Sequence, residues 1–213
     1  MPANPDINEN TQWRSAYLAG GIAALFSLLA VVADIGIGSA LGGNVSALPQ
    51  TALERFAQFQ QNPWVGLYNL DFLNTLNQLI SIPVYFALYA ALRKANPPFA
   101  LLALIVFLVG TSIFAANNTA LPMLDLSRQY ALAGEAQKPL LAAAGEAMLA
   151  RGAHGSRGAF FSFLLPTLAA LIMSLVMLPG RVFSKANALV GVIGNALMLV
   201  YVVLVTFAPQ AKN

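Results

Sequence analysis

The sequence predicts an all-α membrane protein, a bundle of five transmembrane helices with short interfacial helices in two outer loops. Composition gives the first reason: 58% of the 213 residues are hydrophobic and only 9% are charged, with a mean hydropathy of +0.69. A soluble domain has about a quarter of its residues charged, so this chain cannot cover a water-facing surface. The second reason is that five apolar stretches are each long enough to cross about 30 Å of hydrocarbon. We expect a single integral membrane domain over residues 1–213.

The five predicted spans are apolar runs separated by turn residues or by longer polar segments. The second and third spans are joined by RKANPP, where the paired prolines stop the preceding helix. The fourth and fifth are joined by PGRVFSK, which opens on a Pro-Gly turn. The spans cover residues 17–37, 72–92, 99–121, 160–178 and 186–207.

The first span has a competing explanation as a secretory signal peptide. The residues GSA at 38–40 resemble the small-residue site at which such peptides are cleaved. However, the apolar run exceeds the usual core of about 7 to 15 residues, and the leader MPANPDINEN is acidic rather than basic. The sequence therefore favours a membrane anchor that is retained.

The first long loop, residues 38–71, is predicted to contain a short interfacial helix. Leu53, Phe56 and Phe59 recur at helical spacing, which places them on one apolar face. Trp64 lies further along the same loop and is typical of a membrane–water interface.

The second long loop, residues 122–159, is predicted to form two alanine-rich helical segments. Asp125 or Ser127 could cap the first segment, Pro139 suits an opening position of the second, and Gly152 suits its end. We expect both segments to lie across the outer face as a cap.

The distribution of charge predicts the orientation. With the N-terminus inside, the net charge of +3 lies entirely on the inner segments, as the positive-inside rule requires, whereas the outer segments hold six basic and six acidic residues. The prediction is a bacterial inner-membrane protein with its N-terminus inside and its C-terminus outside. The inner charges are Arg14, Arg93, Lys94, Arg181 and Lys185 against Asp6 and Glu9.

Polar side chains line one face of the second span. On a helical projection they fall within an arc of about 120°, and lipid on that side would leave them without hydrogen-bond partners. Polar residues of the first and third spans reach the same depth. The sequence therefore predicts an outward-facing polar crevice that could bind a ligand, although interhelical hydrogen bonding alone would also explain the amides. The candidate residues are Asp34, Asp71, Asn74, Asn77, Gln78, Asn117 and Asn118.

Motifs for catalysis or metal binding are missing from the sequence. The chain has no cysteine and a single histidine, His154, which we expect to be a solvent-facing loop residue. Neither Asp34 nor Asp71 lies in the Gly-x-Gly-Asp pattern of intramembrane aspartyl proteases. The sequence also contains no phosphate-binding loop and no nucleophile elbow with a catalytic serine. The sequence therefore assigns no catalytic residue, no metal ligand and no cofactor. Because the basic residues are scattered, a nucleic-acid partner is not expected.

Three segments resemble one bacterial family of multi-pass membrane proteins, which carries the domain of unknown function 4386. They are RSAYLAGGIAALFSLLAVVADIGIG in the first span, YFALYAALRK at the end of the second, and PGRVFSKANALVGVIGNALML across the last connection. The resemblance covers most of the chain and rests on hydropathy and turn placement. It implies a helical integral membrane fold, with no reaction and no catalytic residue.

Three functional hypotheses follow, of which the first is a non-enzymatic inner-membrane protein. Such a protein would bind a small or lipophilic ligand in the outer crevice, or serve as an accessory subunit of a larger membrane complex. The alternative is a small transporter or channel, which with five spans and no repeat would require a homo-oligomer. An intramembrane hydrolase is the third hypothesis. The expected partners are the bilayer, another membrane subunit or a second copy, and a small lipophilic ligand.

Overall fold

The computed structural model describes residues 5–40, 48–179 and 182–208, with side chains from residue 13 onward. In these residues five helical segments are long and apolar enough to cross a membrane, which confirms the predicted fold class. The first is α1 and the second is formed by α4 and α5 together. The helices are α1 (Pro5–Ala40), α4 (Phe72–Ile80), α5 (Ile82–Leu92), α6 (Pro97–Asn117), α9 (Phe160–Met177) and α10 (Lys185–Phe207).

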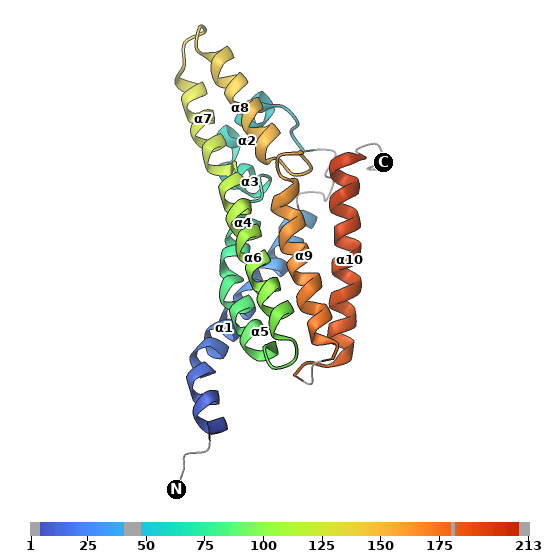
Figure 1. The fold of residues 1–213 in the computed structure, drawn as a ribbon. Helices are drawn as coiled ribbons and strands as arrows, with labels where there is room; N and C mark the ends of the chain where they lie inside the picture. Colours follow the sequence, from blue (N-terminus) through green and yellow to red (C-terminus); the bar gives the residue numbers. More distant parts are fainter. Residues whose placement is uncertain (1–4, 41–47, 180–181, 209–213) are drawn as a thin grey trace.

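The spanning helices pack as a row rather than around a closed centre. α6 packs along α9, α10 packs on α9, and α1 packs on α4 and α5 (Figure 1). Close approach is possible because glycines lie at two crossings, Gly20 of α1 against Ala87 and Gly110 of α6 against Pro166. α1 and α10 lie at the margins of this row, and most of their side chains are exposed to the surroundings of the bundle.

Two predicted spans are interrupted. The second breaks at Ser81, because Pro83 has no N–H to donate and its ring crowds the preceding turn. The third ends at Asn117 instead of residue 121, and after Asn118 and Thr119 the chain resumes in nearly the same direction as a further helix (Figure 1). The fourth and fifth spans begin and end within one residue of the prediction.

The two long loops fold together into a four-helix unit, which we call the cap. It consists of α2 (Ala52–Gln61), α3 (Pro63–Tyr68), α7 (Ala120–Leu132) and α8 (Lys138–Gly152). α2 begins at a capping box, in which Thr51 and Glu54 satisfy each other's backbone N–H groups. The cap has its own hydrophobic core, formed by Ala52, Phe56, Phe59, Leu67, Leu70, Ala120, Met123 and Leu149.

The helical hairpin of α7 and α8 differs from the prediction in two respects. It extends along the axis of the bundle, away from the spans, instead of lying across their ends (Figure 1). Neither Asp125 nor Ser127 caps its first helix, since α7 already begins at Ala120. Ser127 is buried within α7 and donates a hydrogen bond to the Phe56 carbonyl oxygen at 3.0 Å, so this hydroxyl joins α7 to α2.

Candidate functional site

The strongest feature at the junction of cap and spans is Asp71, the residue before α4. Its φ of 60° places it in the left-handed region, and it is the only such non-glycine residue in the part of the chain that the structure describes. Aspartate at this position normally caps the helix with its side chain, but the Asp71 carboxylate accepts no backbone N–H of α4. One carboxylate oxygen instead accepts a hydrogen bond from Asn74 Nδ2 at 2.9 Å.

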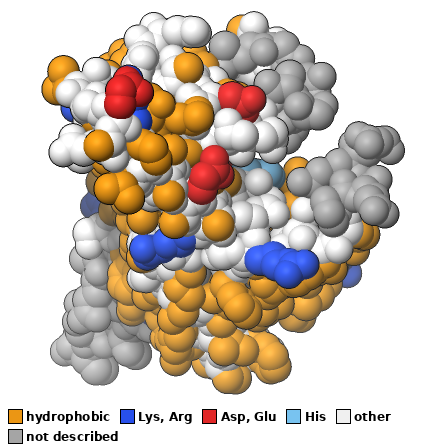
Figure 2. All heavy atoms as spheres, turned by 90° about the horizontal axis from the view of Figure 1, so that it is seen from above, with side chains coloured by type: hydrophobic (Ala, Val, Ile, Leu, Met, Phe, Trp, Pro, Cys, Tyr) orange, Lys and Arg blue, Asp and Glu red, His pale blue; other side chains and the backbone are white. Residues whose placement is uncertain are grey.

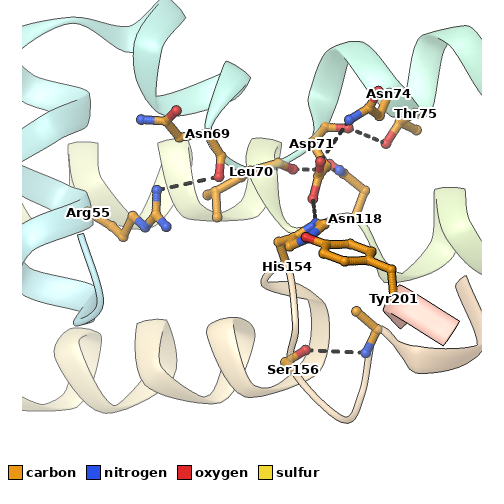
Figure 3. Close-up of polar contacts among 11 residues, drawn as sticks. Arg55, Asn69, Leu70, Asp71, Asn74, Thr75, Asn118, His154, Ser156 and Tyr201 are labelled. Atoms are coloured by element: carbon orange, nitrogen blue, oxygen red, sulfur yellow. Dashed lines mark hydrogen bonds and ion pairs between the residues drawn. The ribbon is translucent and has the colours of Figure 1, made fainter. Parts of the chain in front are cut away.

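The second carboxylate oxygen of Asp71 faces His154, which lies in the loop between α8 and α9 (Figure 3). Asp71 Oδ2 and His154 Nδ1 are 3.4 Å apart, and His154 Nε2 lies 3.4 Å from the Tyr201 hydroxyl of α10. The imidazole also packs edge-on against the Phe163 ring of α9. His154 lies in the predicted loop with its side chain 30% exposed, but it also contacts Asp71, Tyr201 and Phe163, which the prediction did not include. Viewed from the cap end, the histidine is still visible at the surface (Figure 2).

Two of the asparagines predicted for the site, Asn117 and Asn118, lie at the break between α6 and α7, next to Asp71 and the loop before α9. Asn118 Nδ2 donates to the Leu70 carbonyl oxygen at 2.8 Å, which ties the break between α6 and α7 to the residue before Asp71. Asn117 Nδ2 donates to the Gly158 carbonyl oxygen at 3.2 Å, and its Oδ1 accepts from Arg151 Nε at 3.3 Å. These amides fix the loop that carries His154 against the start of α4.

Arg55 of α2 adds a buried positive charge close to this junction. The residue is only 5% exposed, its guanidinium approaches the Asn69 carbonyl oxygen at 3.4 Å, and its Nε has no partner. Burial lowers the pKa of Arg55, and the negative charges of Asp71 and Glu54 oppose that shift. Asp71 therefore contacts His154 directly and acts on Arg55 only through its charge.

The other predicted residues lie apart from Asp71. Asn77 accepts a short hydrogen bond from Ser27, joining α4 to α1, and this is an interhelical role. Gln78 is half-buried on α4. Asp34 interacts with Tyr68 of α3, whose hydroxyl donates to the Asp34 backbone carbonyl oxygen at 2.9 Å.

Two small cavities flank His154, and each has room for about one water molecule. The first is an apolar cleft between α9 and α10, with His154 and Tyr201 at its edge. The second lies on the Asp71 side, and three of the seven predicted residues line it. Its lining residues are Asp71, Phe114, Asn117, Asn118, Gly152, Ala159, Ser162 and Phe163.

Sequence reasoning did not find His154, Arg55 or Tyr201. They belong to separate elements, and only the fold brings His154 to Asp71, Tyr201 to His154, and Arg55 to the Asn69 carbonyl oxygen. The arrangement can hold a polar group by hydrogen bonds from an imidazole and a hydroxyl beside apolar surface. A carboxylate that orients an imidazole also occurs in hydrolases, where the imidazole activates a hydroxyl or water. Here the hydroxyl near the imidazole is the phenol of Tyr201, 3.4 Å away. A phenol hydroxyl is not the nucleophile that a serine hydroxyl provides in those enzymes.

The ionisation of Tyr68 should make the thermal stability of the protein depend on pH in the alkaline range. Burial, followed by the charge of Asp34 and its hydrogen bond, raises the pKa of Tyr68 to about 12. Because this value exceeds the ordinary value of about 10, the stabilisation by neutral Tyr68 is complete below pH ~10 and is lost as the pH rises through ~12. We expect the thermal stability of the wild type to fall more steeply than that of Tyr68→Phe across this range. Tyr17→Phe serves as the control, and equal slopes in all three proteins would contradict the prediction.

The fold and the site define a class, a multi-pass helical membrane protein with a helical cap over one end of its spans. A family model matches residues 15–213, and its description is domain of unknown function (DUF4386). The chain belongs to this family. No curated protein and no solved structure matches the chain.

Proposed function

We propose that this protein is a non-enzymatic membrane protein that binds a small or lipophilic ligand where the cap meets the spans. The proposal rests on the left-handed backbone conformation of Asp71 and on the contact between its carboxylate and His154. A non-glycine residue in the left-handed region is strained by about 1 kcal/mol or more, and such residues cluster at functional sites. The carboxylate also leaves the cap position of α4 unused and faces His154.

Three of the remaining predicted residues take supporting roles in this proposal. Asn117 and Asn118 position the loop that carries His154, and Asn74 orients the Asp71 carboxylate. Asp34, Asn77 and Gln78, which lie apart from Asp71, are left out of the proposed binding groups. The binding groups are then Asp71, His154 and Tyr201, which come from three separate elements.

An accessory-subunit role is the second candidate, because the cap has a hydrophobic core of its own. A folded unit at one end of a membrane bundle offers a rigid surface for another subunit. Exposed apolar residues lie at the tip of the hairpin, where Leu132 is 90% and Leu140 is 72% exposed. The two candidates are compatible, since the cap adjoins the site where Arg55 of α2 approaches the Asn69 carbonyl oxygen, two residues before Asp71.

The experiment is detection of a retained ligand on the purified full-length protein by native mass spectrometry from a mild detergent. We expect the wild type to carry a non-protein mass and Asp71→Asn to carry it at one-tenth the occupancy or less. Asparagine tolerates the left-handed conformation, so this change removes mainly the charge. Asp125→Asn, at an exposed position of α7, should match the wild type. An absence of bound mass in the wild type, or equal occupancy in Asp71→Asn, would refute ligand binding.

The same spectra report the number of copies. A monomer would count against the transporter alternative, which needs several copies around a shared pathway. A symmetric oligomer that carries no ligand would favour transport over the proposed binding role.

We also propose that the cap faces the outside of the bacterial inner membrane, as the charge distribution predicts. Ala136→Cys, exposed at the hairpin tip, should react with an impermeant thiol reagent added outside to cells with a permeable outer membrane. Ala95→Cys, exposed between α5 and α6, should react only after the inner membrane is opened. The natural chain has no cysteine, so background labelling is absent. The opposite labelling pattern would reverse the orientation.

A further inference from the structure

Two exposed arginines lie close together where the chain passes from the cap into α9. Arg151 belongs to the last turn of α8, and Arg157 belongs to the loop that follows. This loop folds back on the end of α8, because Gly158 packs so closely that an added Cβ would lie 2.7 Å from the Arg151 Cα atom. The fold therefore brings two positive charges to one place at the junction of cap and spans.

The guanidinium of Arg151 is held at the end of α6. Its Nη2 donates to the Ala116 carbonyl oxygen at 3.0 Å, and its Nε donates to Asn117 Oδ1 at 3.3 Å. A cation is favourable here, since the last carbonyl groups of a helix carry partial negative charge. Within the described residues, Nη1 of Arg151 and the whole guanidinium of Arg157 have no hydrogen-bond partner. The two side chains therefore keep donors that another molecule can use.

No carboxylate among the described residues lies at ion-pair distance from either arginine. The acidic groups of the cap have other partners: two form ion pairs within the hairpin of α7 and α8, while Glu54 and Glu146 accept backbone N–H groups at the start of α2. Asp71 contacts Asn74 and His154 instead. Two exposed cations that no carboxylate neutralises attract an anion.

An exposed strip of α6 runs from Arg151 toward the middle of the span. Ala116, whose carbonyl oxygen binds Arg151, is exposed, and Val109 and Ile105 lie on the same helical face with exposed fractions of 48% and 49%. Ser112 lies between them, and its hydroxyl donates to a carbonyl oxygen of its own helix, so it needs no partner from outside. Seen from the cap end, basic side chains lie where the cap meets the apolar surface of the spans (Figure 2).

We propose that Arg151 and Arg157 bind the phosphate of an anionic phospholipid, whose acyl chains lie along the exposed strip of α6. A guanidinium suits a phosphate, because its planar N–H groups form paired hydrogen bonds with phosphate oxygens. The contacts of Arg151 with α6 fix its position before the lipid arrives, which reduces the entropy lost on binding. A lipid is favoured over a soluble anion because the apolar strip begins where the two charges lie.

This surface is separate from the contact between Asp71 and His154, so the inference goes beyond the proposed function. The bound lipid lies on an open face of the bundle and requires no cavity. It would hold the loop between α8 and α9, which also carries His154.

The test is native mass spectrometry of the full-length protein in a mild detergent, with added phosphatidylglycerol or phosphatidylcholine of identical acyl chains. We expect the wild type to bind phosphatidylglycerol with a dissociation constant lower by about fivefold or more, since each arginine near the head groups favours an anionic lipid. Millimolar inorganic phosphate should leave this preference unchanged. A preference that phosphate abolishes would show that the surface binds a free anion, and the lipid inference would fail.

The decisive variant is Arg157→Gln, because it removes one charge and breaks no contact within the described residues. It should reduce the preference to about twofold or less, and Arg151→Gln with Arg157→Gln should abolish it. Since Arg151→Gln also removes the bonds to α6, the melting temperature of the double variant is measured, and Arg157→Gln alone decides if the double variant does not fold. Arg128→Gln makes the same change of net charge at an exposed position of α7 and should keep the preference.

The opposite end of the spans provides the competing location, because Arg14 and Lys185 are exposed there. Loss of the preference in Arg14→Gln or Lys185→Gln, with retention in Arg157→Gln, would place the lipid at that end and refute the inference. Equal affinities of the wild type for the two lipids, or an equal loss in Arg128→Gln and Arg157→Gln, would also refute it. Asp71→Asn should keep the phosphatidylglycerol adduct. A molecule that is lost in Asp71→Asn and retained in Arg157→Gln belongs to the proposed function, so each proposal can fail alone.

Discussion

Gly110→Ala is expected to lower the free energy of unfolding by about 1–3 kcal/mol, because the added methyl group overpacks the crossing of α6 and α9. A Cβ at Gly110 would lie 2.7 Å from Pro166 Cδ, 2.9 Å from Leu165 Cβ and 2.9 Å from the Pro166 backbone nitrogen. The proline ring and the backbone cannot rotate away, so the two helices must separate. This crossing is the most extensive helix contact among the described residues, and its loss affects the whole row of spans.

The matched control is Gly194→Ala on α10, where no atom lies within 4 Å of the added Cβ. This change should be neutral or stabilising by up to about 1 kcal/mol, since alanine favours a helix more than glycine does. Both variants are compared by thermal unfolding in the same detergent, followed by circular dichroism and by the monodispersity of the heated sample. Equal melting temperatures for the two variants would contradict the close packing of α6 and α9 at Gly110.

Asp71→Asn is expected to cost about 1–3 kcal/mol, and the loss should depend on Arg55. Removing the carboxylate takes away a nearby negative charge that favours the charged form of the buried Arg55 guanidinium, so the burial of that cation is less compensated. Arg55→Met removes the basic group and keeps much of its volume. In the double variant neither charge is left alone, so its loss should be about 1 kcal/mol or more smaller than the sum of the two single losses.

The comparison pair is Asp125→Asn with Arg128→Gln, which breaks an exposed ion pair on α7. Its members lie 3.8 Å apart with side chains 67% and 69% exposed, so both changes should be nearly silent and additive. The four single and two double variants are measured by thermal unfolding under identical conditions. Strict additivity for Arg55 and Asp71 would show that the two charges act independently, and Asp71 would then interact only with its neighbours on α4 and the loop before α9.

The candidate site shows where sequence reasoning succeeds and where it stops. The polar pattern predicted that Asp71, Asn74, Asn117 and Asn118 share one end of the bundle, because lipid would leave them unsatisfied on any other side. They lie there in the structure, and their part in binding a ligand stays a prediction. The pattern could not show that Asn77 pairs with Ser27, since helical projection gives a direction but no partner. It assigned His154 to solvent because a lone histidine in a glycine-rich loop carries no periodic signal.

The sequence by itself determined the fold class, because the length of an apolar run and its charge content decide whether a helix crosses the hydrocarbon. It also determined the short connections, where proline and glycine act through local backbone geometry. Only the tertiary structure decided that the two long loops form one cap, that Asp71 adopts a left-handed conformation, and that His154, Tyr201 and Arg55 lie around it. Those contacts join residues that are distant along the chain, and their energies depend on the packing of α2, α4, α9 and α10, which no local pattern encodes.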